Sequence, residues 1–198
     1  MLRILGKSTS INVRKVLWTC DELGLAYEQR ESGPELTANP NGLEPVIVDG
    51  DFVLWESNTI IRYLAGRMAA ETLLPRDPRR RADIEKWIDW QASDFNAAWR
   101  YAFSAIARRN PVFDDPRQIE ASKREWARMV GIVEGQLAAT GAYIAGDRFT
   151  LADIPIGLSV NRWFMTAMER PVFPAVAAYY DRLSARPAFL KHGRNGID

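Results

Sequence analysis

Residues that could stabilise an anion gather in a short segment near the start of the chain, Gly6-Lys7-Ser8-Thr9-Ser10-Ile11-Asn12. An apolar pattern at helical spacing follows the segment and continues to Leu23. Hydroxyl donors beside the free N–H groups of a helix N-terminus favour a bound anion such as a thiolate. Serine is also a preferred N-cap residue, so Ser10 could instead only cap the helix. The segment predicts one of these two roles.

Activation of a thiol would need little else from the protein. A free thiol has a pKa of about 8.5, and lowering it by about two units requires roughly 2.7 kcal/mol of preference for the thiolate, which two or three hydrogen bonds to the anion can supply. No protein base and no metal ion is required. The single histidine, His192, lies in the last seven residues, where we expect poor order. Cys20, on the apolar helix face, is expected to be buried and inert.

A second candidate site begins at Pro45, which precedes the β-branched run 46–48. Proline cannot donate to a strand ladder, so it belongs at the first residue of a strand. If the Glu44-Pro45 bond is cis, the chain turns sharply and the backbone N–H and C=O groups of Val46 face outward. They could then pair with an extended, peptide-like ligand.

The residues after Val48 extend this site. Asp49-Gly50 predicts a hairpin to a second strand, 52–54. Glu56 and Ser57 then open a helix in which apolar residues recur at helical spacing. The positive end of the helix dipole suits a ligand carboxylate.

The elements that must position these groups divide the chain into two parts. Residues 1–70 predict the order βαβ followed by ββα, which is that of a thioredoxin-like α/β domain. The stretch 71–80 contains two prolines and a charge run, and it marks a boundary between domains at 1–75 and 81–198. The second domain is predicted to be all α-helical. Its expected helices include a long one that begins over Ile84–Phe95 and carries Trp99 and Phe103, one over 119–137, one opened by a capping box at 150–153, and one final helix.

Four strings in this order, NPNG, LWESN, RYLA and TLADI, resemble the glutathione S-transferase family, most closely its bacterial serine-type or theta-like members. The resemblance implies a cytoplasmic homodimer that conjugates glutathione, as co-substrate, to a small hydrophobic electrophile, in a detoxifying role. In serine-type members the catalytic hydroxyl lies a few residues before an R-K-V stretch, so Arg14-Lys15-Val16 makes Ser10 the best match. Ser8, Thr9 and Asn12 remain alternatives, and Asn12 could orient the hydroxyl or contact the sulfur.

The resemblance also implies roles for other residues. The glutathione-binding set is Pro45, Val46, Glu56, Ser57 and Asp94, with Asp94 reaching the partner subunit's glutathione across a two-fold interface. The electrophile pocket would be formed by Trp99, Phe103 and Trp163. A solvated carboxylate is an equal alternative for Asp94, and aromatic residues at helical spacing more often form core than pocket.

One departure from the family pattern affects the expected site. The segment Glu31–Ala38 has only eight residues, where the family carries a longer segment that contacts the glycine end of glutathione. That contact would be exposed to solvent, supplied by Lys7 or Arg14, or absent. Two alternative functions therefore stay open: a non-catalytic protein that binds glutathione or an apolar ligand, and a glutathione-dependent disulfide or peroxide reductase.

Composition excludes several other classes. The 26 basic and 25 acidic side chains nearly balance, which gives no overall field to attract nucleic acid or an anionic membrane. The pair Arg108-Arg109 is interpreted as a solvated helix end. A single cysteine excludes a disulfide framework, and the first 25 residues contain no uninterrupted apolar stretch typical of a signal peptide or membrane span.

Overall fold

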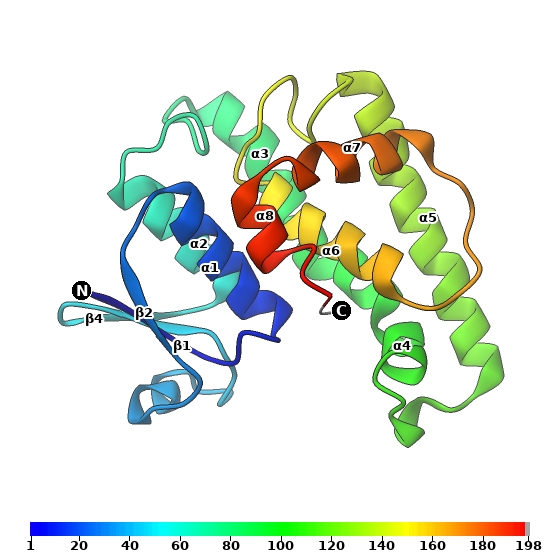
Figure 1. Cartoon of the computed structure of the whole chain (residues 1–198), viewed down its shortest axis with the longest axis horizontal. Coiled ribbons are helices and arrows are strands. Elements are labelled where there is room, and N and C mark those ends of the chain that lie inside the picture. The colour runs from blue at the N-terminus through cyan, green and yellow to red at the C-terminus, as the bar shows by residue number, and fades with distance from the viewer. Residues whose placement is uncertain (197–198) are drawn as a thin grey trace.

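The N-terminal part of the chain forms a four-stranded mixed sheet in the computed structural model, which describes residues 1–196. The strand order is β2-β1-β3-β4; β1 and β2 are parallel, and the other two pairs are antiparallel (Figure 1). The strands are β1 (Leu2–Leu5), β2 (Tyr27–Arg30), β3 (Val46–Asp49) and β4 (Phe52–Trp55). Helices α1 (Ile11–Glu22) and α2 (Ser57–Arg67) pack against the sheet, and this thioredoxin-like arrangement is the one predicted from the sequence.

The hairpin is present as predicted, and the proline bond has the isomer on which the proposed sharp turn depended. Glu44-Pro45 is cis, and Pro45 immediately precedes β3. In the hairpin, Asp49 pairs with Phe52, so the two turn residues are Gly50 and Asp51, one position later than expected.

The C-terminal part is entirely helical in the described residues. It comprises α3 (Pro78–Trp90), a π-helical turn (Gln91–Phe95), α4 (Asn96–Ile106), α5 (Pro116–Thr140), α6 (Asp153–Met165), α7 (Pro174–Ser184) and α8 (Pro187–His192). Short 3₁₀ turns occur at Pro34–Ala38 and Pro111–Phe113. The long helix predicted to begin over Ile84–Phe95 is present, with a π-helical turn at Gln91 that the sequence pattern did not predict. One expectation is corrected: the single final helix is two helices, because Pro187 lies where a second one can begin.

One hydrophobic core spans both parts of the chain. Trp18 of α1 is fully buried, with its ring centroid 5.0 Å from that of Phe189 in α8 and 5.9 Å from that of Phe149. Helix α6 approaches the same ring at Gly157, where an added Cβ would lie 3.0 Å from Trp18 Cη2 and 2.7 Å from Leu183 Cδ1. Glycine at this position therefore permits the close packing of α6 on α1.

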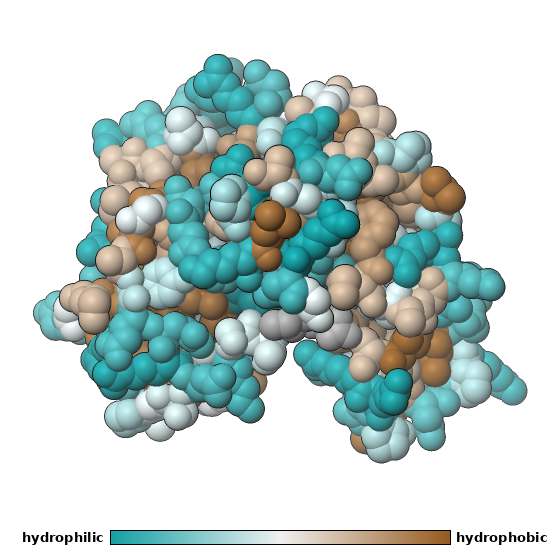
Figure 2. All heavy atoms as spheres, in the orientation of Figure 1, coloured by the Kyte–Doolittle hydropathy of each residue, from teal (hydrophilic) through white to brown (hydrophobic). Residues whose placement is uncertain are grey.

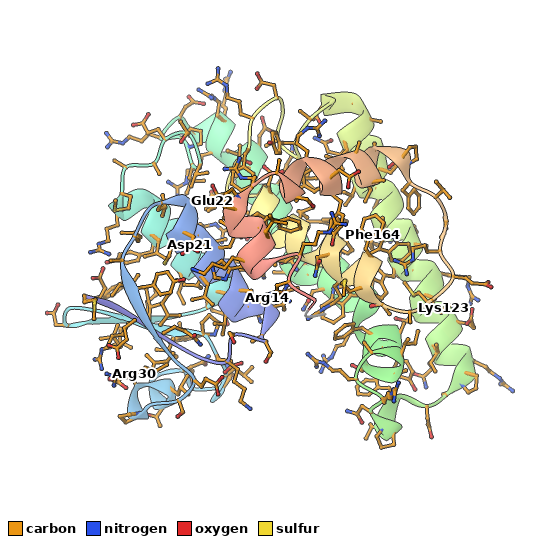
Figure 3. All side chains as sticks on the ribbon, viewed as in Figure 1. Arg14, Asp21, Glu22, Arg30, Lys123 and Phe164 are labelled. Atoms are coloured by element: carbon orange, nitrogen blue, oxygen red, sulfur yellow. The ribbon has the colours of Figure 1, made fainter. Side chains whose placement is uncertain are left out.

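The C-terminal segment is also held against α1, contrary to the expected poor order around His192. His192 is buried, and its Nε2 lies 2.8 Å from Asp21 Oδ2. Arg14 projects from α1 toward this segment (Figure 3) and donates to the carbonyl oxygens of His192, at 2.5 Å, and Gly193, at 2.6 Å. Cys20 is buried as expected, and burial raises the pKa of its thiol to about 12.

A buried polar network joins the two parts near the start of α1. Lys15 Nζ donates to Asn58 Oδ1 of α2 at 3.1 Å and to Gln91 Oε1 of the π-helical turn at 2.9 Å. Gln91 donates in turn to Ser159 Oγ of α6 at 2.9 Å. Burial, followed by the nearby charge of Arg162, lowers the pKa of Lys15 to about 7.

This lowered pKa makes stability depend on pH. Between pH 7 and 10.5 the unfolded chain binds a proton at Lys15 that the folded protein has lost, so stability rises with pH in this window. Restricting the comparison to pH 7–9 avoids the opposite effect of Cys20, whose thiol ionises only in the unfolded chain above pH 9. Over these two units, wild type should gain about 2 kcal/mol relative to Lys15→Met, as measured by urea unfolding.

The matched control is Lys86→Met, which removes an exposed lysine that pairs with Asp83 on α3. Its stability should change with pH in parallel with that of wild type. Parallel profiles for wild type and Lys15→Met would show that Lys15 is not the group responsible.

Among the described helices, none combines the length and the apolar character needed to cross a membrane.

Candidate active site

The hydroxyl of Ser10 is not used for helix capping. Ser10 occupies the N-cap position of α1, and its carbonyl accepts the first helical hydrogen bond, from the Arg14 N–H, at 2.9 Å. Its side chain makes no cap hydrogen bond, although serine at this position commonly does so. The half-buried hydroxyl is thus placed at the positive end of α1, where no acidic side chain occupies the first turn. Of the two predicted roles, the capping role is excluded.

The first turns of α1 and α2 lie side by side. Ser57, the first residue of α2, donates its hydroxyl to Asn12 Oδ1 of α1 at 3.3 Å. Ser57 is buried and Asn12 is exposed, so the contact lies at the surface edge of the two helix N-termini. Two helix dipoles therefore present their positive ends at one place, which is an arrangement suited to anionic groups.

Glu56 has an unusual backbone conformation. It is the N-cap residue of α2, and its φ of 73° and ψ of 105° lie in a region that residues other than glycine rarely adopt. Such outliers are most common at ligand sites, where the surrounding structure holds them in place. The side chain is exposed at the edge of the joined helix N-termini. The carboxylate is thus available to a cation outside the protein.

The backbone of Val46 does not face outward, and this prediction is corrected. Val46 pairs with Leu5 of β1 on one side and with Trp55 of β4 on the other, so its polar groups face neighbouring strands. Pro45 is buried beside it. Glu44, on the other side of the cis bond, is outside every strand and is only partly buried. Glu44 is therefore the residue whose main chain can meet an extended ligand.

The loop that carries Ser10 is fixed against Glu44. The N–H of Lys7 donates to Glu44 Oε2 at 2.8 Å. Gly6 has a φ of 138°, and a Cβ at this position would lie 2.8 Å from Glu44 Cβ and 2.6 Å from Val13 Cγ2. Only glycine allows this approach, which brings the cis-proline loop next to the serine loop.

A cavity of about 300 Å³ opens at this place, between the serine loop and the helical part. Its lining residues are Thr9, Ser10, Ile11, Asn12, Glu44, Asn96, Trp99, Arg108 and Arg162. Figure 2 shows the outline of the molecule notched between the two parts of the chain. Larger hollows exist: one of about 570 Å³ around Arg80 and Arg148 contains none of the predicted site residues, and one of about 420 Å³ contains only Asp94 of that set. The cavity includes Ser10, Thr9 and Asn12 but not Ser8, which narrows the sequence alternatives to three.

Only one of the three predicted pocket aromatics lines this cavity. Trp99 of α4 does so, whereas Phe103, one turn later, is buried behind it with ring centroids 5.3 Å apart. Trp163 lies in the core against Trp126, with ring centroids 5.2 Å apart. The prediction of a pocket formed by all three rings is therefore wrong for Phe103, which is buried behind Trp99, and for Trp163, which lies in the part of α6 where every residue from Asp153 to Trp163 is buried.

Asp94 lies outside the cavity, in the π-helical turn before α4. It is exposed in the π-helical turn, accepts the hydroxyl of Ser93 at 2.9 Å, and borders a separate hollow with Tyr101 and Glu125. Within one subunit Asp94 is not part of the cavity around Ser10.

Sequence reasoning missed two arginines of the cavity. Arg108 follows the C-terminal end of α4, and its pairing with Arg109 was interpreted as a solvated helix end. Arg162 lies in α6 and is buried, with its guanidinium carbon 4.3 Å from the Trp99 ring centroid and 4.0 Å from that of Phe103. No local signal identifies either residue, since only the tertiary fold places them opposite Ser10.

The shortened segment after β2 forms a 3₁₀ turn at Pro34–Ala38, followed by a loop closed by Asn39. The buried Asn39 donates to the Leu43 carbonyl at 2.7 Å and accepts the Asn41 N–H at 3.0 Å. Of the two basic residues predicted for the glycine end of glutathione, Arg14 is engaged with the C-terminal segment, so its prediction is corrected. Lys7 is exposed beside the site.

Comparisons with known proteins agree with this fold. A family model described as glutathione S-transferase, N-terminal domain, matches residues 5–72, and one described as glutathione S-transferase, C-terminal domain, matches residues 96–187. The chain is 35% identical to glutathione S-transferase GstB of Escherichia coli strain K12, with 96% of this chain and 97% of the relative covered. It is 32% identical to glutathione S-transferase 3 of Zea mays, with 96% and 92% covered.

Solved structures give the same result. The theta class glutathione S-transferase of Xanthomonas axonopodis pv. citri, solved with glutathione bound, has a TM-score of 0.88 to this chain at 36% identity, covering 97% of this chain and 96% of that one. The fold, the site geometry and these similarities lead to one assignment: the chain belongs to the glutathione S-transferase family and is an enzyme of that class.

Proposed function

We propose that this enzyme conjugates glutathione, through its sulfur, to small electrophiles, with Ser10 as the catalytic residue. The observation that carries the proposal is the Ser10 hydroxyl, which lies in the cavity at a helix N-terminus and makes no cap hydrogen bond. This hydroxyl donates to the glutathione sulfur and favours the thiolate. The thiolate attacks the acceptor carbon, a carbon–sulfur bond forms, and the leaving group departs with the electron pair of its broken bond. Asn12 orients the bound sulfur.

The γ-glutamyl end of glutathione is assigned to the start of α2. Its carboxylate accepts from the Ser57 hydroxyl and from the free N–H groups of the first helical turn. Its ammonium pairs with the Glu56 carboxylate, which is exposed at the start of α2. The adjacent N-termini of α1 and α2 support this assignment, because both favour negative charge at one place.

The remaining parts of glutathione extend along the serine loop. The cysteinyl backbone pairs with the main chain of Glu44, next to the cis bond with Pro45, rather than with that of Val46. The glycine carboxylate lies near Lys7, whose charge is exposed to solvent, so this end contributes little to affinity.

The proposal also covers how the acceptor binds, how subunits assemble and what the enzyme does in the cell. Trp99 supplies an aromatic face to the acceptor in the cavity. We propose a cytoplasmic homodimer in which Asp94 contacts the ammonium of the partner subunit's glutathione, and a role in the detoxification of electrophiles.

The test of this function is a panel of reactions at constant glutathione. Formation of a conjugate from 1-chloro-2,4-dinitrobenzene, identified by its absorbance and mass, is the expected result. Reduction of a mixed disulfide without any conjugation would instead identify a reductase. Binding of glutathione in calorimetry with neither reaction would identify a non-catalytic binding protein.

The role of Ser57 predicts a loss of affinity in Ser57→Ala. A hydrogen bond to a charged carboxylate contributes about 1.5 to 3 kcal/mol, so Kd for glutathione should rise by about tenfold or more. Thr59→Ala is the matched control, because Thr59 is exposed in the same helical turn. Calorimetry measures both constants. Equal Kd values for Ser57→Ala and wild type would show that Ser57 does not bind glutathione.

A further inference from the structure

The cavity at Ser10 has a positively charged lining. Arg108 and Arg162 both line it, and a guanidinium stays protonated at every relevant pH. Among the described lining residues, Glu44 is the only carboxylate, and its Oε2 already accepts the Lys7 N–H at 2.8 Å. Arg108 therefore brings a positive charge to the lining of a pocket that the sequence predicted as a set of three aromatic rings.

Aromatic rings position both guanidinium groups. Arg162 stacks on Trp99 and Phe103, at 4.3 Å and 4.0 Å from their centroids, and the guanidinium carbon of Arg108 lies 5.1 Å from the Phe103 centroid. Trp99 and Phe103, which were predicted to line an apolar pocket, thus hold the two guanidinium groups in place through cation–π contacts. A stacked guanidinium binds a planar anion through the N–H groups at its edge.

Arg108 is the more accessible of the two arginines. Its side chain is exposed, and it forms no ion pair with any carboxylate of residues 1–196. It lies just beyond the end of α4 at Ile106, and its exposed side chain lines the cavity. An incoming acceptor can therefore reach its charge without displacing an existing partner.

We propose that Arg108 binds a carboxylate of the acceptor, so that the preferred electrophiles are small organic acids with a leaving group near the acid function. This inference rests on the proposed transferase function. The volume of about 300 Å³ favours a small acceptor. With a 2-halo acid, the thiolate forms the carbon–sulfur bond, the carbon–halogen bond breaks, halide leaves with the electron pair, and the carboxylate is unchanged.

The kinetic test compares chloroacetate with chloroacetamide, which match in size and leaving group but differ in charge. The kcat/KM for chloroacetate is divided by that for chloroacetamide, and this quotient is divided by the same quotient of the uncatalysed rates with glutathione. The result is the corrected ratio. For wild type we expect a corrected ratio of about ten in favour of the acid. Arg108→Gln should lower this ratio about fivefold to tenfold, mainly by raising KM for chloroacetate. Arg108→Lys should retain part of the preference.

Arg109→Gln is the matched control, since it removes an exposed arginine next in sequence that does not line the cavity. It should leave the corrected ratio unchanged. A wild-type ratio near one, or equal losses in Arg108→Gln and Arg109→Gln, would overturn the proposal.

A binding measurement separates this proposal from the proposed function. S-carboxymethylglutathione and S-carbamoylmethylglutathione differ by the same charge, and calorimetry gives their Kd values without turnover. Tighter binding of the carboxymethyl compound, lost in Arg108→Gln, supports the anion site even if no acceptor is conjugated. Conjugation of chloroacetamide together with equal Kd values refutes the anion site alone. Absence of both conjugation and binding refutes the two together.

Discussion

Ser10→Ala is expected to lower kcat/KM for conjugation at pH 6.5 by about 10- to 100-fold. The hydroxyl is placed at the start of α1 without a capping role, so its removal deletes one donor to the thiolate. If the bound thiol returns from a pKa near 6.5 to about 8.5, its ionised fraction at pH 6.5 falls roughly fiftyfold. A more basic thiolate is a stronger nucleophile, which offsets part of this loss.

The pH dependence distinguishes this role from a structural one. Above pH 9 glutathione ionises without help, so the deficit of Ser10→Ala should shrink toward a few-fold. Ser8→Ala is the control, because it deletes a hydroxyl in the same loop that does not line the cavity. Thr9→Ala tests the remaining hydroxyl. A deficit that is constant from pH 6.5 to 9.5, or one that follows Thr9 instead, would refute the assignment.

The second large expected effect is a loss of folding stability in Asp153→Ala. Asp153 Oδ2 accepts the N–H and hydroxyl of Thr150, at 2.7 Å and 3.1 Å, while Oδ1 accepts the N–H of Ile144 and the hydroxyl of Tyr179, both at 3.0 Å. The capping box therefore works differently from the prediction. Asp153 reaches back to the Thr150 amide as expected, but the Thr150 hydroxyl donates to Asp153 instead of capping the helix.

Removing this carboxylate leaves several buried donors without an acceptor, each at a cost of about 1 to 3 kcal/mol. Burial raises the pKa of Asp153 to about 6, so stability falls as pH rises from 4 to 6 and the ionised group carries a penalty at pH 7. The net loss in Asp153→Ala is therefore expected to be about 3 kcal/mol, below the sum of the separate bonds. Urea unfolding at pH 7 measures this loss.

Asp147→Ala is the comparison, because Asp147 is exposed before the same helix and its nearest cation, Arg148 Nε, is 3.9 Å away. It should change stability by less than about 0.5 kcal/mol. Equal stabilities for the two variants would mean that Asp153 does not anchor α6. Asp153→Asn, which keeps one acceptor oxygen, should fall between Asp153→Ala and wild type.

Short sequence patterns were sufficient to predict those structural features that depend on neighbouring residues in the chain. The hairpin after Asp49, the cis bond at Pro45 and the helix start at Ser57 each depend on residues within a few positions. The helix predicted over 119–137 is present as α5 (Pro116–Thr140), because its buried residues recur at helical spacing.

The missed features depend on contacts between residues far apart in sequence. Arg14 donates to the carbonyl groups of His192 and Gly193, which lie 178 and 179 positions later in the chain. Arg162 reaches the cavity only because α6 packs beside α4. In α6 every residue from Asp153 to Trp163 is buried, so no apolar face distinguishes pocket from core and Trp163 could not be placed from its spacing. An arginine next to another charged residue, such as Arg108 beside Arg109, has the sequence pattern of a solvent-exposed residue, and only the fold shows that it lines a cavity.

The ionisation of bound glutathione, followed by ultraviolet difference titration of the thiolate, tests the central claim most directly. The enzyme, saturated with glutathione, should show a thiol pKa at least one unit below the free value of about 8.5, and Ser10→Ala should return it toward that value. A bound thiol that titrates like free glutathione in wild type, or one that stays equally acidic in Ser10→Ala, would contradict the claim that Ser10 activates the sulfur.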